Sequence, residues 1–218
     1  PTFGIKVERK EQRKPEILTI GEIRKFLKEA KNLNHPWYPI WAMALLTGMR
    51  SGELYALLWT DIDWENELLS VNKSYNCRRR CVKSTKSGEV RDVPISSELM
   101  ALLREIKIQA GSRPEVLPRF GSWTKGDQAS VLRMFCTGIG VPSIKFHTLR
   151  ACFATQLLRT GVAPAQIQKI CGWKNLETMQ RYIRLAGIEI KGATEGLKVL
   201  PEAEVMAQVV NLFAKDPV

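Results

Sequence analysis

The chain has 218 residues, of which 44% are hydrophobic and 25% charged, and it carries a net charge of +11. These proportions are those of an ordinary globular protein. No uninterrupted apolar run approaches the roughly 20 residues that cross a bilayer, and the first residues lack the apolar core of a signal peptide. A basic excess of this size favours a polyanionic partner, most often nucleic acid.

The cysteines and histidines do not form a metal-binding pattern. Five cysteines stand at irregular spacings, and the chain has two histidines. Neither a second cysteine pair nor a nearby histidine completes a zinc site around Cys77 and Cys81. We expect reduced thiols, a cytoplasmic compartment, no metal and no cofactor.

The N-terminal third of the chain reads as a tail followed by helices. Residues 1–16 are polar, mixed in charge and basic on balance, which is typical of a solvated tail or of an arm that contacts DNA. The segment "TIGE" at Thr19–Glu22 is a capping box, and it predicts a helix that ends near residue 33. A second helix, "PWYPIWAMALLTG", is expected to end at Thr47–Gly48, and a short third helix follows in "SGELYALLW".

The hydrophobic pattern then changes to that of strands. We expect strands over 68–71, 75–82 and 90–93, and "KSGE" at residues 86–89 is typical of a hairpin turn. Helices are predicted again over residues 96–108, 126–137, 147–159, 164–170, 175–185 and 201–213. The fold class is therefore α+β, mainly α, with a small antiparallel sheet.

The predicted sheet is rich in basic side chains. Solvated faces often look like this, but a basic ribbon also follows a phosphate backbone, and the overall charge favours DNA contact. Lys86 differs because a tight turn can aim its side chain. The other candidates for DNA contact in this region are Lys73, Arg78, Arg79, Arg80, Lys83 and Arg91.

Two short motifs place cations at helix starts. In "TGMRSGEL", Arg50 follows a glycine-containing turn, where its planar fork could bind two oxygens of one phosphate. Glu53 could orient Arg50, although a buried structural pair is an equally good interpretation. In "HTLRACFATQLL", His147 and Arg150 share a helix face, and Lys145 precedes them, which favours phosphate binding over simple packing.

The motif "CGWKNLETMQRYIR" contains the candidate nucleophile. Gly172 ends one helix, Trp173 follows it, and Tyr182 lies on the next helix between Arg181 and Arg184. A phenol has an ordinary pKa near 10, so Tyr182 is a weak nucleophile unless cations surround it. Periodicity alone does not show that the cations of the other motifs converge on it.

The four motifs in this order, "TGMRSGEL", "KSTKSGEVRDVPI", "HTLRACFATQLL" and "CGWKNLETMQRYIR", resemble the catalytic domain of the tyrosine recombinases, also called phage integrases. The resemblance covers roughly residues 19–184. It implies the catalytic fold of that family and a site-specific DNA recombinase, which cleaves and rejoins DNA through a 3′-phosphotyrosyl intermediate without metal or ATP. It also implies a bacterial or phage-encoded enzyme of a mobile genetic element, associated with the nucleoid.

The resemblance assigns a role to each candidate of the site. Tyr182 would be the nucleophile, and Arg50 and Arg150 would hold the non-bridging oxygens. His147 would assist proton transfer at the tyrosine, while Lys86 would protonate the departing 5′-oxygen. Glu53 would support the site without reacting. Lys145, Arg181 and Arg184 would contact the DNA backbone.

One position departs from the commonest pattern of the family. Where many members have a second histidine, this chain has Trp173, as Cre-like members do. An indole N–H is a donor only. Trp173 would therefore bind a phosphate oxygen and pack against the tyrosine helix, and it would not move a proton.

The resemblance also implies a domain organisation and an assembly. Residues 1–18 would be the arm from a missing N-terminal DNA-binding domain, 19–186 the catalytic domain, and 187–218 a tail whose helix docks on a neighbouring protomer. The expected assembly is a homotetramer on double-stranded DNA with a specific recombination site, with accessory factors, whereas the isolated fragment would be monomeric.

Two alternatives remain open at this stage. One is a sequence-specific DNA-binding protein that kept the fold without catalysis, because a charge of +11 needs no chemistry. The other is a type IB topoisomerase or telomere resolvase, which also uses a tyrosine.

Overall fold

The computed structural model describes residues 17–84 and 90–187, together with Thr194 and Leu197. Lys86, the arm over 1–16 and the predicted helix over 201–213 lie outside the described residues. The elements, in chain order, are α1 (Ile20–Asn32), α2 (Tyr38–Thr47), α3 (Ser51–Ala56), the 3-10 turn η1 (Trp59–Asp61), β1 (Ile62–Asp63), β2 (Leu68–Val71), β3 (Lys73–Asn76), β4 (Cys81–Ser84), β5 (Arg91–Pro94), α4 (Ser97–Ala110), α5 (Gly121–Lys125), α6 (Gln128–Gly138), α7 (Phe146–Arg159), α8 (Pro164–Cys171) and α9 (Leu176–Ala186). The predicted class, α+β and mainly α, is confirmed.

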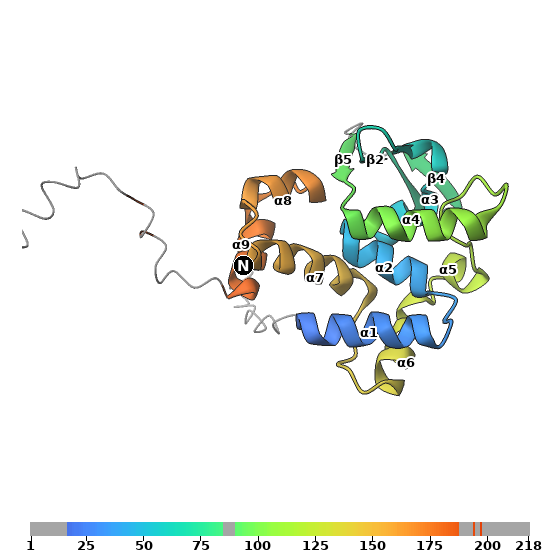
Figure 1. The fold of residues 1–218 in the computed structure, drawn as a ribbon, viewed down its shortest axis with the longest axis horizontal. Coiled ribbons are helices and arrows are strands. Elements are labelled where there is room, and N and C mark those ends of the chain that lie inside the picture. The colour runs from blue at the N-terminus through green and yellow to red at the C-terminus, as the bar shows by residue number, and fades with distance from the viewer. Residues whose placement is uncertain (1–16, 85–89, 188–193, 195–196, 198–218) are drawn as a thin grey trace, which may run out of the picture. The chain divides into compact units, whose positions relative to one another are not determined.

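The helix α2 forms the centre of the core. Nearly every side chain from Ile40 to Thr47 is buried, as expected for a helix that is apolar on all sides. Figure 1 shows α2 between α1 and α4, and it also contacts α7. Aromatic side chains fill this core, among them Phe26, Trp41 and Trp123.

The helix α1 begins as its capping box predicts. The Thr19 hydroxyl accepts a hydrogen bond from the backbone N–H of Glu22, and the Glu22 carboxylate accepts one from the backbone N–H of Thr19. This reciprocal pair satisfies two of the donors that a helix N-terminus leaves open.

A second, smaller core joins α7, α8 and α9. Its buried members include Leu158, Ile167 and Met179, one from each helix. Trp173 and Tyr182 pack against this cluster and are partly buried. The C-terminal helices are thus held to the rest of the domain through α7, which also packs against α2.

The strands form two antiparallel sheets among the described residues, of order β1-β2-β5 and β3-β4. The predicted continuous strand over 75–82 is wrong, because a turn divides this segment into β3 and β4. In that turn the Asn76 side chain accepts a hydrogen bond from the backbone N–H of Arg79, and Arg80 adopts a left-handed φ of 47°. The turn predicted at 86–89 lies outside the described residues; the strands before and after it in the chain, β4 and β5, belong to different sheets. Strand pairing depends on distant partners, which local turn residues do not reveal.

Glycine explains one further difference from the expected helices. The helix predicted over 126–137 is present as α6 but begins at Gln128, because Gly126 adopts a left-handed conformation with φ of 90° and ends α5, a short helix that was not predicted. No helix of the described residues is long and apolar enough to cross a membrane.

Gly48 allows α7 to pack closely against the end of α2. It has a φ of 62°, and a Cβ atom placed there would lie 2.3 Å from Cδ1 of Phe153 on α7. A glycine is therefore required both for the backbone conformation and for the close approach of the ring.

We expect Gly48→Ala to lower the free energy of unfolding by about 2–4 kcal/mol, from a strained left-handed alanine and an overpacked contact. Urea denaturation measures this loss. Gly138→Ala is the matched control, because a Cβ there would meet nothing within 4 Å. A Gly48→Ala variant as stable as Gly138→Ala would contradict the packing described.

Candidate active site

Arg50 lies at the corner between α2 and α3. It is the N-cap residue of α3, and its backbone N–H donates to Oε2 of Glu53 over 2.7 Å. Its guanidinium donates to Oε1 of Glu53 over 2.9 Å and is 53% exposed. The predicted orientation of Arg50 by Glu53 is therefore present, with the cation facing outward.

Glu53 is shared between two arginines. Its carboxylate is 3% exposed, and Arg91 donates to both oxygens, over 3.1 Å to Oε1 and 2.6 Å to Oε2. Burial by itself would raise the pKa of Glu53, but the hydrogen bonds and charge of Arg91, with those of Arg50, lower the pKa below its usual value. Glu53 is thus a carboxylate at neutral pH and supports the arginines.

Arg150 is buried between two turns of the backbone. It is 7% exposed, and its guanidinium donates to the carbonyl of Gly48 over 2.6 Å and to the carbonyl of Cys171. Burial lowers its pKa to about 10, so Arg150 remains a cation at neutral pH. One side chain thereby ties the corner beside Arg50 to the end of α8.

Trp173 and Tyr182 form a parallel stack. Their ring centroids are 4.6 Å apart with an interplanar angle of 8°, and Cζ of Arg150 lies 5.2 Å from the centroid of the indole. Partial burial raises the pKa of Tyr182, and the charges of Arg150, Arg181 and Arg50 oppose this effect without overcoming it. The phenol is therefore protonated at neutral pH, and attack by its oxygen needs a proton acceptor.

The basic residues that precede Arg150 on the chain are exposed. Lys145 is the N-cap residue of α7, and His147 is the second residue of that helix. Both side chains are open to solvent, whereas Arg150 on the same helix points into the domain. His147 is therefore accessible to a ligand outside the protein surface.

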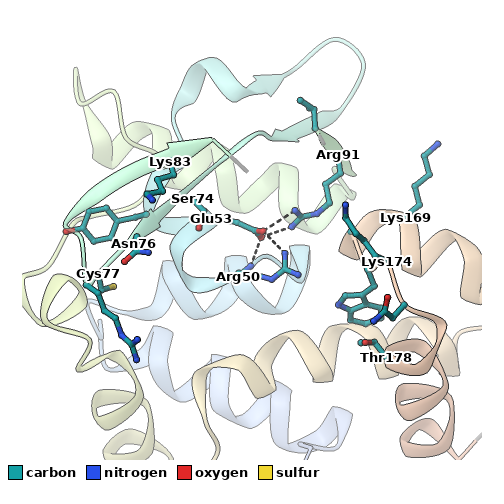
Figure 2. A pocket seen from close by; sticks show the side chains of 16 residues that line it. Arg50, Glu53, Ser74, Asn76, Cys77, Lys83, Arg91, Lys169, Lys174 and Thr178 are labelled. Carbon is teal, nitrogen blue, oxygen red and sulfur yellow. Dashed lines mark hydrogen bonds and ion pairs between the residues drawn. The ribbon is translucent and has the colours of Figure 1, made fainter. Parts of the chain in front are cut away.

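A groove opens beside these residues. Figure 2 shows side chains of the β3-β4 hairpin on one side and of α8, α9 and their connection on the other, with the Glu53 pairs between them. Among the described residues that line it, Glu53 is the single carboxylate, against the cations Arg50, Arg78, Lys83, Arg91, Lys169 and Lys174. The groove is therefore strongly positive.

The predicted DNA contacts divide into two sets. Lys73 pairs with Asp61 over 2.6 Å, and Arg91 is held by Glu53, so both stabilise the domain internally. The remaining members are exposed or line the groove: Arg78, Arg79, Arg80, Lys83, Lys145, Arg181 and Arg184. Their contacts with DNA stay predictions.

The sequence contained a signal for the buried position of Arg91. Side chains alternate between the faces of a strand, so Arg91 and Val93 point to the same side of β5. Val93 is 1% exposed, which places that side in the core.

The described residues contain no cluster of histidine, cysteine and carboxylate side chains that could hold a metal ion.

The domain is mainly helical and has two small sheets, and its Tyr182 stacks on Trp173 beside Arg150. This is the architecture of a tyrosine recombinase catalytic domain. Residues 16–187 match the phage integrase family. The chain belongs to this family.

The relatives are similar over most of this chain but are longer than it. A XerC-like tyrosine recombinase of Caldanaerobacter subterraneus is 31% identical over 78% of this chain and 50% of its own length. A XerA tyrosine recombinase of Saccharolobus solfataricus is 29% identical over 83% of this chain and 55% of its own length. The chain thus spans about half the length of these curated relatives.

Solved structures share the fold. The Tn1549 transposon integrase in complex with transposon right end DNA has a TM-score of 0.68 and 17% identity, over 95% of this chain and 69% of that chain. The catalytic domain of bacteriophage HP1 integrase has a TM-score of 0.58 and 22% identity, over 84% of this chain and 95% of that chain.

Proposed function

We propose that this chain is the catalytic part of a site-specific DNA recombinase, or integrase, that cleaves and rejoins strands through a 3′-phosphotyrosyl intermediate. The observation that carries the proposal is the stack of Tyr182 on Trp173 beside the buried cation of Arg150. Arg150 also binds the backbone next to Arg50, so two guanidinium groups and a tyrosine belong to one site.

In the proposed cleavage step, the energy of the broken phosphodiester bond is kept in the new phosphotyrosyl bond. The Tyr182 oxygen attacks phosphorus as its proton passes to a base, a P–O(tyrosyl) bond forms, and the P–O5′ bond breaks. His147 is our proposed partner for the tyrosine proton, and Lys86 gives a proton to the departing 5′-oxygen. Attack by a 5′-hydroxyl on the phosphotyrosine reverses the step, so rejoining needs neither ATP nor metal.

The arginines would stabilise the charge that spreads over the non-bridging oxygens. Arg50 is exposed toward the groove and is aligned by Glu53, which fits direct contact with a phosphate. Trp173 would donate its indole N–H to the same group and hold the tyrosine helix by its ring stack.

We infer that double-stranded DNA with a specific recombination site lies along the positive groove. Support comes from the cations that line it and from the DNA complex of the Tn1549 integrase. We also propose the assembly and organisation expected from the family: a homotetramer on DNA, with accessory factors, in the cytoplasm near the nucleoid. In this assembly, residues 1–18 form an arm, residues 19–186 form the catalytic domain, and residues 187–218 form a tail that docks on a neighbouring protomer.

A covalent trapping experiment tests the function. Nicked suicide duplexes, tiled across the DNA that flanks the gene, lose a short fragment after cleavage and cannot be rejoined. We expect a protein–DNA adduct that survives denaturing electrophoresis, with Tyr182 as the modified residue in peptide mass spectrometry. Plasmid relaxation without any specific site would indicate a topoisomerase. Specific binding with no adduct on any duplex would indicate a DNA-binding protein without catalysis.

A further inference from the structure

Arg91 donates three hydrogen bonds to groups within the protein, although the sequence suggests that it contacts DNA. Its side chain is 10% exposed, and it donates through Nη1 and Nη2 to the two oxygens of Glu53 and through Nε to the carbonyl of Ile170 over 2.9 Å. All three of its nitrogen atoms are engaged by the protein. Three of the five N–H groups of this guanidinium are therefore bound by groups of the protein itself.

The partners of Arg91 belong to two separate parts of the site. Glu53 aligns the exposed guanidinium of Arg50 on α3, while Ile170 lies in the last turn of α8. The next carbonyl, that of Cys171, accepts from Arg150. Two guanidinium groups therefore bind consecutive carbonyls at the C-terminal end of α8, where a helix leaves carbonyls without partners and carries partial negative charge.

The chain after these carbonyls leads directly to the stacked indole. Gly172 ends α8 with a φ of 63°, and a Cβ placed there would lie 2.8 Å from Cδ of Arg91. The methylene stem of Arg91 thus packs against the backbone that precedes Trp173. A shift of Arg91 would move both the carboxylate that aligns Arg50 and the turn that carries Trp173.

We propose that Arg91 is a positioning residue, which sets the geometry of Arg50 through Glu53 and of Trp173 through the end of α8. This inference rests on the proposed function, and it gives Arg91 a role other than the DNA contact expected from the sequence. A lysine keeps the charge but lacks the planar fork, so it cannot bind both carboxylate oxygens and the Ile170 carbonyl together.

The test is single-turnover cleavage of a suicide duplex by Arg91→Lys. We expect the rate at saturating DNA to fall about 10–100-fold, because misplaced groups reduce the chemical step, and the DNA dissociation constant to stay within about twofold. Arg104→Lys on the exposed face of α4 makes the same exchange away from the site and should cleave as the wild type does. A wild-type rate in Arg91→Lys, or weaker DNA binding with an unchanged rate, would overturn the proposal.

A second measurement separates positioning from general stability. The Arg50→Lys background keeps a cation at this position and hence a measurable cleavage rate. In this background Arg91→Lys should lower the cleavage rate by less than about threefold, since part of its effect passes through Arg50. An equal loss in both backgrounds would show that Arg91 does not act through Arg50 and would overturn that part of the proposal.

If Arg91→Lys does not fold, Arg91→Met with Glu53→Gln removes the buried pair without leaving a buried charge unpaired, because Arg50, the other partner of Glu53, is exposed. We expect this double variant to fold and to cleave at least about 10-fold more slowly than the wild type. Cleavage at the wild-type rate would overturn the proposal. Absence of any adduct from the wild-type protein would instead contradict the proposed function itself.

Discussion

Replacement of Tyr182 by phenylalanine should abolish the covalent adduct and leave DNA binding intact. The phenyl ring retains the stack on Trp173, whose centroid lies 4.6 Å away, so the fold of the site is preserved. Only the attacking oxygen is lost, and removal of a nucleophile lowers the cleavage rate by at least about 10⁴-fold. Denaturing electrophoresis of suicide reactions measures the adduct, and a gel-shift titration measures the affinity.

Tyr38→Phe is the matched control for this experiment. Tyr38 lies at the start of α2, where Lys31 sits over its ring, and it has no role in the site described. This variant should form the adduct at the wild-type rate. An adduct that persists in Tyr182→Phe would show that another residue is the nucleophile.

Replacement of Arg150 by lysine should damage both stability and catalysis. The two carbonyls that Arg150 binds, of Gly48 and Cys171, come from segments far apart in the chain, and one ammonium group cannot reproduce the planar fork between them. We expect the free energy of unfolding to fall by about 2–4 kcal/mol, since buried polar groups lose their partners. The cleavage rate should fall by about 10²–10⁴-fold, because the cation that we propose to stabilise the phosphate is displaced.

Arg159→Lys provides the comparison for Arg150→Lys. Arg159 lies on the same helix and also donates to a backbone carbonyl, that of Ala186, but its side chain is exposed. Its replacement should cost less than about 1 kcal/mol of stability in urea denaturation. Equal losses for the two variants would mean that burial of Arg150 between the two turns does not matter.

Local patterns predicted the helices better than the sheets. The capping box at Thr19 and the apolar stretch of α2 each specify a helix through interactions a few residues apart, and both predictions are confirmed. The strand over 75–82 was wrong because the chain reverses within it, between β3 and β4, and β5 pairs with the distant strand β2 and not with β4, the strand before it. Turn residues show where a chain can reverse, but they do not choose the partner strand.

The same difference between local and long-range interactions applies to the candidate site. The sequence by itself determined which groups are available: a tyrosine, an indole, a carboxylate and an excess of cations, in an order that matches one family. Only the tertiary structure decided which of them meet. Arg150 and Gly48 are 102 residues apart in the chain yet share a hydrogen bond, and Arg91, which was expected to contact DNA, donates to Glu53. Such contacts arise when α7 packs on α2 and α8 on β5, and no local periodicity encodes that packing.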